Sequence, residues 1–255
     1  MNSLKELRPY QLVILDCPYD TWDSQETREL FVKVVGLKLK GYLMSYPYGT
    51  LPVDTNDFVG THHLICEKLD GHWVPVMGYK SITLSRCKQH QLTFPPLAFL
   101  QAVGAIEHLE EVKKILEVAA KQKHEIAYDG SWAMEPEIRK DKAKSEYLKE
   151  IMAAINVLYH QNYNIPEIIG IGVPKFKTDQ YFEGLGYERI QHGGNLLSPF
   201  ITPVIPNEYT VLMHLKQFSD QAISSARRFQ SLWKNRLEIS DPTASTRMGA
   251  KKVAA

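Results

Sequence analysis

Hydrophobic positions along the chain switch repeatedly between the spacing of strands and the spacing of helices. Short apolar runs predict strands at residues 10–17, 62–68, 73–87, 125–134, 167–173, 187–191 and 209–218. Apolar residues three and four apart predict helices at residues 24–40, 109–120, 145–158, 178–185 and 219–237. An Asp70–Gly71 turn joins two of the strands as a hairpin, whereas the later strands alternate with helices. This order predicts an α/β fold with a mixed sheet flanked by helices.

The stretch from His124 to Tyr187 holds the pattern most typical of a ligand site. A strand ends at Glu135–Pro136, a basic loop follows over residues 139–145, and an amphipathic helix comes next. Backbone N–H groups and the dipole at a helix N-terminus favour anions, so the pattern indicates a phosphate-bearing ligand. A different interpretation is also open, in which the lysines are the solvated start of an exposed helix. Cations there oppose the dipole and need a compensating group.

Composition narrows the class of protein. The 255 residues are 44% hydrophobic and 23% charged, with a net charge of +1, so no overall field favours nucleic acid or an anionic membrane. Three cysteines without paired spacing predict reduced thiols in a cytoplasmic protein. The N-terminal apolar run is too short for a signal core or a membrane span. The adjacent pair His62–His63 has no further ligand at metal spacing, so no metal is expected.

We expect one main domain over residues 1–218. An amphipathic helix within residues 219–240 is expected to pack on it, and residues 241–255 are expected to form a flexible tail. Residues 41–60 are rich in Gly, Pro, Tyr and Asp and predict a long loop. Loops of that length in a compact domain are usually functional.

Two short segments carry a resemblance to a known family. Thr178–Tyr187 (TDQYFEGLGY) is similar to the A-x-x-F-Y-x-x-L-G-F segment of the GNAT acyltransferase superfamily, and Met134–Arg139 (MEPEIR) is similar to its V-x-P-x-x-R. The resemblance extends over about residues 10–218. A helix-bearing insert at residues 92–123, preceded by Asp54 and Asp57, resembles the branch of autoinducer synthases and long-chain N-acyl amino acid synthases.

The resemblance implies a fold whose two central strands splay apart around an acyl thioester, carried by coenzyme A (acyl-CoA) or by an acyl carrier protein. The pantetheine would pair with the backbone of Trp132, Ala133 and Met134. The phosphates would lie on the basic loop, whose implied binding residues are Arg139, Lys140, Lys142, Lys144 and Ser145. Lys142 and Lys144 stand where the family has glycines. They either bind phosphate directly as point charges or close the cradle.

Acyl transfer to an amine needs a proton acceptor for the attacking nitrogen. Asp129 is the first candidate for this general base and Glu135 the second, because a carboxylate in a partly buried strand can have a raised pKa. Strand alternation places Asp129 and Ser131 on one face, with Trp132 on the other. Either carboxylate could instead cap the strand or pair with a lysine.

The family's acid for the leaving thiolate would fall at Phe182, which cannot donate a proton. Either Tyr181 serves as the acid from a shifted register, or no acid is needed because coenzyme A thiolate is a tolerable leaving group. A plain core role for both rings is the alternative. The candidate residues for the acceptor are Asp54, Asp57, His62 and Arg86. Acidic side chains suit an amine, and Arg86 could hold a carboxylate.

These features predict an N-acyltransferase that moves an acyl group directly from a thioester to an amine, such as an amino acid or related small molecule. The expected partners are that small-molecule acceptor and, for a carrier-bound donor, an acyl carrier protein; nucleic acid and a membrane span are not expected. The alternative is a catalytically impaired domain of the same fold that binds a ligand or a partner, which the displaced tyrosine and the two lysines favour.

Overall fold

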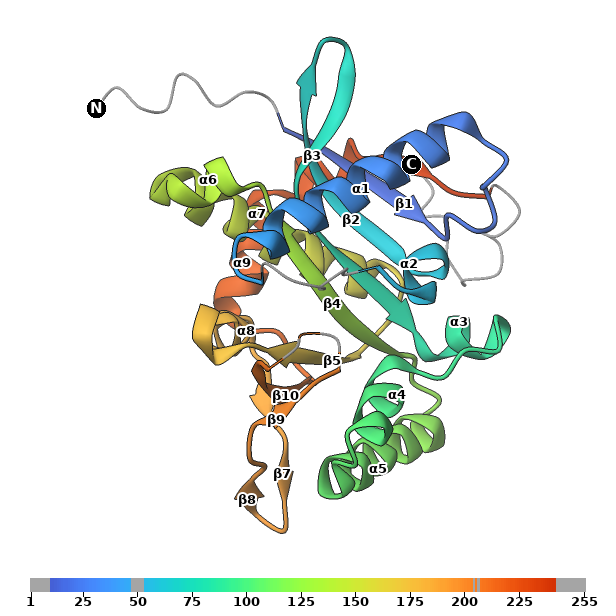
Figure 1. Ribbon diagram of the computed structural model, residues 1–255, viewed down its shortest axis with the longest axis vertical. Coiled ribbons are helices and arrows are strands. Elements are labelled where there is room, and N and C mark those ends of the chain that lie inside the picture. Colours follow the sequence, from blue (N-terminus) through green and yellow to red (C-terminus); the bar gives the residue numbers. More distant parts are fainter. Residues whose placement is uncertain (1–9, 47–52, 204, 206, 242–255) are drawn as a thin grey trace.

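The structure is a computed structural model that describes residues 10–46, 53–203, 205 and 207–241. One mixed sheet runs through it, and Figure 1 shows helices on both of its faces. In spatial order the strands are β11 (Leu237–Ile239), β1 (Gln11–Asp16), β2 (Thr61–Leu69), β3 (His72–Thr83), β4 (Ile126–Met134), β5 (Glu167–Gly172), β10 (Tyr209–Leu215) and β6 (Glu188–Arg189). The short strand β9 (Phe200–Ile201) pairs with β10, and β7 (Gln191–His192) pairs with β8 (Asn195–Leu196).

The helices divide the hydrophobic core into two layers. One face of the sheet carries α1 (Gln25–Leu43), α2 (Thr55–Val59), α4 (Pro95–Ala102) and α5 (Ile106–Gln122) (Figure 1). The other face carries α7 (Lys142–Asn162), α9 (Asp220–Arg228) and α10 (Gln230–Lys234). Phe99 and Val112 of the first layer pack against Ile126 and Ile169 of the central strands. The insert predicted between the third and fourth strands is therefore present as α4 and α5, and the mixed α/β fold is confirmed.

The two central strands separate halfway along their length. β4 pairs in parallel with β5 only from Ile126 to Asp129, opposite Glu167 to Gly170. Beyond that point β4 continues to Met134 while it stays paired with β3 on its other side. The edge of β4 that faces β5 is therefore free of strand partners after Asp129, which matches the splayed arrangement that the resemblance implies.

The separation begins at a β-bulge. Ser131 has a left-handed backbone with φ of 57°, and the register between β3 and β4 shifts between Gly78 and Lys80. The bulge rotates the strand, so Trp132 packs on the α7 face, where the carboxylate of Asp129 also lies. The prediction that Asp129 shares its face with Ser131 and not with Trp132 is wrong, because it assumed unbroken alternation.

The segment predicted as a basic loop is mostly helical. Arg139 and Lys140 belong to a short helix, α6 (Pro136–Lys140), and α7 begins two residues later. Asp141 is the N-cap of α7, and its carboxylate accepts a hydrogen bond of 3.1 Å from the backbone N–H of Lys144. The negative charge of Asp141 at the N-terminus of α7 offsets the unfavourable interaction of the nearby lysines with the helix dipole.

Two further boundaries differ from prediction. The third strand ends at Thr83, whose hydroxyl caps α3 (Leu84–Gln89) by accepting a 3.2 Å hydrogen bond from the N–H of Arg86. Arg86 therefore lies on a helix and not on a strand. The predicted loop at residues 41–60 contains the end of α1 and all of α2, while residues 47–52 are outside the described part.

The predicted C-terminal helix is interrupted. Phe229 separates α9 from α10, and the chain then forms β11, which pairs in parallel with β1. α9 is tied to α7 by Arg228, whose Nη1 lies 2.8 Å from both carboxylate oxygens of Glu150. The predicted flexible tail lies, from residue 242 onward, outside the described residues. Within the described ranges, no helix combines the length and apolar character needed to cross a bilayer.

Candidate functional site

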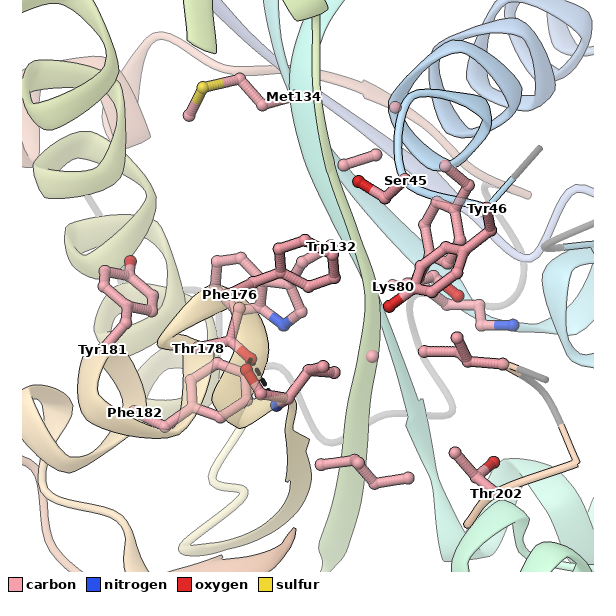
Figure 2. A pocket seen from close by; sticks show the side chains of 18 of the residues that line it. Ser45, Tyr46, Lys80, Trp132, Met134, Phe176, Thr178, Tyr181, Phe182 and Thr202 are labelled. Carbon is pink, nitrogen blue, oxygen red and sulfur yellow. Dashed lines mark hydrogen bonds between the residues drawn. The ribbon is translucent and has the colours of Figure 1, made fainter. Parts of the chain in front are cut away.

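A cavity of about 600 Å³ occupies the space where β4 and β5 separate. Its wall takes residues from both faces of the sheet, and Figure 2 shows β4 running between the two groups. Tyr46, Lys80 and Thr202 lie on the side of α1 and α4, whereas Tyr181 and Phe182 lie on the side of α7. A ligand in the cavity would therefore lie along the free edge of β4 and contact both faces.

The α7-side wall is aromatic and is built around Trp132. Its indole stacks on Tyr79 with ring centres 4.5 Å apart and meets Phe182 edge-on at 5.5 Å. Phe182 comes from α8 (Thr178–Leu185), which packs so closely on β5 that a Cβ at Gly172 would lie 2.7 Å from the Cα of Asp179. This close packing fixes the aromatic wall beside the free strand edge.

One end of the cavity wall carries positive charge. Arg139 of α6 and Lys149 of α7 both line it and are exposed to solvent. Lys140, Lys142 and Lys144 do not line the cavity. Lys140 pairs with Glu137 at 2.7 Å, and the side chain of Lys142 is 88% exposed and lies 3.9 Å from Glu146. Of the cations on α6 and α7, Arg139 and Lys149 thus reach the cavity, and Lys149 was not among the residues predicted from the sequence.

The predicted pantetheine residues lie where the resemblance implied. Trp132, Ala133 and Met134 all line the cavity and belong to the part of β4 that has left β5. Ser145 also lines it, although its hydroxyl donates to the sulfur of Met134 at 3.5 Å. This set comes together because the first turn of α7 lies beside the end of β4, where Ser145 contacts Met134.

The α1-side wall contains a buried network of charges. Lys80 lines the cavity, and its Nζ lies 3.0 Å from a carboxylate oxygen of Asp54 and 3.2 Å from one of Asp57. Asp54 also lines the cavity and is 52% exposed at its side chain. Asp57 is buried behind them and pairs with Lys38 as well. Lys80 is a site residue that strand periodicity did not single out, since it occupies an apolar strand.

The network shifts the pKa values of its members. Burial favours the neutral carboxyl of Asp57, but Lys80 and Lys38 outweigh it and hold its pKa below the ordinary value. Burial lowers the pKa of Lys38 to about 8 despite the attraction of Asp57. Burial and the nearby Lys38 lower the pKa of His62 to about 4. At neutral pH, Asp57 is therefore ionised and His62 is neutral.

Three of the residues predicted to bind the acceptor do not line the cavity. Asp57 supports Lys80 from behind, and His62 contacts the backbone oxygen of Asp57 through Nε2 at 2.7 Å. Arg86 binds Asp16 with two hydrogen bonds of 2.7 and 3.1 Å and donates to the backbone oxygen of Val59. Among the four, Asp54 alone contacts the space where an acceptor would lie.

The first predicted base, Asp129, lies at the point where β4 and β5 part. Its carboxylate is fully buried on the α7 face, accepts a 2.6 Å hydrogen bond from Asn156 Nδ2 and lies 3.5 Å from His160 Nε2. Asp129 does not line the cavity, whereas its neighbours Tyr128 and Gly130 do. Any proton that reaches Asp129 from the cavity must therefore be passed on by another group.

The other two predicted catalytic residues are engaged in the structure. Glu135 does not line the cavity and binds Lys40 Nζ at 3.1 Å. Tyr181 does line it, but its hydroxyl donates to the backbone oxygen of Lys149 at 3.0 Å. Burial raises the pKa of Tyr181 above its ordinary value, which keeps the phenol protonated. Their catalytic roles remain predictions.

Comparison with solved structures reveals the fold of this chain. A CoA-dependent acyl-homoserine lactone synthase, BjaI, with SAM and isopentyl-CoA superposes with a TM-score of 0.54 at 13% identity, over 94% of this chain and 99% of that one. The same synthase with MTA gives 0.52 at 12% identity, over 94% and 99%. FeeM, an N-acyl amino acid synthase from uncultured soil microbes, gives 0.49 at 13% identity, over 88% and 98%.

Neither a protein-family model nor a curated protein sequence matches the chain. At these identities the likeness is one of fold, and it extends over nearly the whole length of both chains. The GNAT-like architecture predicted from the two short segments is thereby confirmed, including its autoinducer-synthase-like variant: this chain has the fold of the acyl-homoserine lactone synthases.

Proposed function

We propose that the protein is an N-acyltransferase that transfers an acyl group directly from a thioester to an amine. The observation that carries this proposal is the free edge of β4 inside the cavity, from Gly130 to Met134. An extended amide-bearing arm such as pantetheine can add to an unpaired strand edge through main-chain hydrogen bonds. The fold shared with a synthase whose structure contains isopentyl-CoA supports this use of the edge.

The charges along the cavity support an orientation for the two substrates. Arg139 and Lys149 suit the phosphates of the donor, because guanidinium and ammonium groups bind phosphate strongly. Asp54 and Lys80 present one negative and one positive group on the α1 side, which suits an acceptor with both an amino and a carboxylate group. We therefore infer an amino acid or a related small molecule as acceptor, placed across β4 from the donor.

The proton from the attacking amine needs a route to a base. Asp129 can serve only through a relay, because its carboxylate lies behind the cavity wall beside Asn156 and His160. One oxygen, Oδ1, forms no hydrogen bond within the described part of the chain, so it has capacity to accept one. We propose that a water molecule carries the proton from the amine to this oxygen, because a carboxylate can act as a general base through one water.

The donor could be coenzyme A or an acyl carrier protein, which share the phosphopantetheine arm. The exposed lysines 140, 142 and 144 stand near the basic end of the cavity without lining it. A protein carrier would contact such outlying charges, whereas free acyl-CoA would depend on Arg139 and Lys149. The three free, buried cysteines are compatible with the cytoplasmic location predicted from the sequence.

Isothermal titration with acyl-CoA of several chain lengths tests the binding claim. We expect saturable binding that Arg139→Glu and Lys149→Glu weaken about tenfold or more, since each replaces an attraction by a repulsion. Lys142→Glu is the matched control and should leave acyl-CoA affinity almost unchanged. If no acyl-CoA and no acylated carrier protein binds, the proposal is wrong.

Two observations favour the alternative of a ligand-binding module without catalysis. The hydroxyl of Tyr181 donates its hydrogen bond to a backbone oxygen. Phe182, which cannot donate a proton, occupies the position where the resembled family has the residue that protonates the leaving thiolate. The two functions differ in turnover and not in binding. Release of free coenzyme A from acyl-CoA in the presence of a panel of amino acids supports the enzyme; tight binding without release across that panel supports the module.

A further inference from the structure

Three side chains of metal-ligating type meet outside the cavity, at the end of β1. Cys17, Asp20 and His90 each offer one ligand atom, and these atoms lie within 4.8 Å of one another. The sulfur of Cys17 lies 3.9 Å from Nε2 of His90. Within the described ranges this is the one such group of three or more. His90 follows Cys17 by more than seventy positions, so the sequence spacing gave no sign of the group.

Backbone hydrogen bonds position two of the three residues, Cys17 and Asp20. Cys17 has a left-handed conformation with φ of 44°, and its N–H donates to the oxygen of Gly60 at 3.1 Å. A tight turn, closed by a 2.9 Å bond from the N–H of Asp20 to the oxygen of Cys17, returns Asp20 beside the thiol. The site is thus set by a constrained turn on one side.

The other side of the group is the end of α3. His90 is the C-cap residue of this helix, and its N–H donates to the oxygen of Arg86 at 3.1 Å. The ring of Tyr19 meets the imidazole of His90 edge-on, with centres 5.7 Å apart. The imidazole is half-buried and Asp20 is exposed, whereas Cys17 is buried. An ion here would have protein ligands on its inner side and an open approach from solvent.

We propose that Cys17, Asp20 and His90 bind one zinc ion per chain. Thiolate, imidazole and carboxylate are the three ligand types that Zn²⁺ takes in proteins, and the soft sulfur disfavours Mg²⁺ and Ca²⁺. Bond lengths of about 2.3 Å to sulfur and 2.0 Å to nitrogen place tetrahedral ligand atoms about 3.5 Å apart. The observed 3.9 Å between sulfur and nitrogen needs only a small closure.

Three protein ligands leave the fourth position of a tetrahedral ion to water. On binding, the Cys17 thiol becomes a thiolate and releases its proton to solvent, while the imidazole binds in its neutral form through Nε2. The ion would join the end of β1 to the end of α3. The site is separate from the cavity and does not depend on the proposed acyl transfer.

Cobalt titration of the chelator-treated protein tests the site, because Co²⁺ replaces Zn²⁺ and its bond to a thiolate gives a near-ultraviolet absorption band. We expect one Co²⁺ per chain, a band that one equivalent of Zn²⁺ abolishes, and loss of the band in Cys17→Ser. Cys66→Ser and His72→Gln are the matched controls, since they change another buried cysteine and an exposed histidine, and both should keep the band.

His90→Gln is the second variant, because a half-buried histidine can be replaced with less risk of misfolding than a buried cysteine. Circular dichroism checks the fold of every variant. It should weaken Co²⁺ binding while the protein remains folded. A wild-type protein that gives no thiolate band and takes up no stoichiometric zinc overturns the proposal. The same holds for a folded Cys17→Ser variant with an unchanged band. Metal content is measured without any substrate, so the outcome is independent of acyl transfer.

Discussion

Replacing Asp57 by asparagine tests the charge network behind the α1-side wall. Asp57 is 1% exposed, and it pairs with two lysines that are almost as deeply buried, Lys38 and Lys80. Asparagine has nearly the same shape, and its amide oxygen can still accept the hydrogen bond that the carboxylate accepts from the N–H of Asp54 at 2.9 Å. The substitution therefore removes the negative charge with little change in packing.

The magnitude follows from which lysine keeps a partner. Breaking a buried ion pair by removing one member costs about 3–5 kcal/mol, because the other charge stays buried. Lys80 retains Asp54 at 3.0 Å, so the loss falls mainly on Lys38. We expect a loss of about 3 kcal/mol in the free energy of unfolding at pH 7. For a chain of this size, this corresponds to a fall of about 6–12 °C in Tm.

Urea unfolding followed by circular dichroism measures this loss. Asp54→Asn is the matched control: its side chain is half exposed, so it should cost less than about 1 kcal/mol. Adding Lys38→Met to Asp57→Asn should recover part of the stability, because the stranded charge is then gone. A cost below about 1 kcal/mol for Asp57→Asn, or a double variant no more stable than the single one, would refute this reasoning.

Three further outcomes follow from the structure. Gly172→Ala should lower the free energy of unfolding in urea by about 1–3 kcal/mol, because its Cβ would meet the Cα of Asp179 at 2.7 Å. Gly184→Ala is the control and should cost nothing, because the space around its Cβ is open. Equal effects would contradict the packing argument. Burial lowers the pKa of His62 to about 4, so between pH 6.5 and 4 the unfolded chain binds a proton that the folded chain does not. Stability should therefore fall as the pH falls through this range, and His62→Gln should flatten this dependence. Identical pH dependence in the two proteins would exclude the shift. Tyr181→Phe should lower the free energy of unfolding by about 1 kcal/mol, because one hydrogen bond is lost, and it should leave acyl-CoA affinity unchanged. A fall in kcat of tenfold or more would then identify Tyr181 as the acid.

The sequence was sufficient for the elements that depend on local periodicity. The predicted strand at 125–134 corresponds to β4 at Ile126–Met134, and the predicted insert at 92–123 contains α4 and α5. Both the hydrophobic spacing and the short segments around Pro136 and Gly186 are local features, which one chain displays directly. The fold, and the position of the β4 residues that line the cavity, could therefore be predicted.

The remaining differences between prediction and structure arise from backbone conformations that the residue types alone do not reveal. A serine at the left-handed position of the bulge is rare, so alternation through Ser131 was the natural assumption and it failed. Ser24 is the N-cap of α1, and its hydroxyl accepts a 3.4 Å hydrogen bond from the N–H of Thr27. Asp141 caps α7 in the middle of a lysine-rich segment, which the charge pattern alone described as a loop.

Contacts between distant segments were beyond reach from one sequence. Lys38, Asp57 and Lys80 come from three elements and meet only after α1 has packed on β3. The same is true of Cys17 and His90, which lie 73 positions apart in the sequence. A single sequence records which residues could form charge pairs or metal sites, but the pairing itself is a property of the tertiary packing.

The most direct test of the central claim is a crystal structure of the protein with an acyl-CoA bound. The proposal predicts pantetheine along the free edge of β4, hydrogen-bonded to the backbone between Gly130 and Met134, with the phosphates toward Arg139 and Lys149. The thioester should then lie near the point where β4 and β5 part, within reach of Asp54 and Lys80. A donor bound elsewhere, with the edge of β4 left uncontacted, would contradict the account.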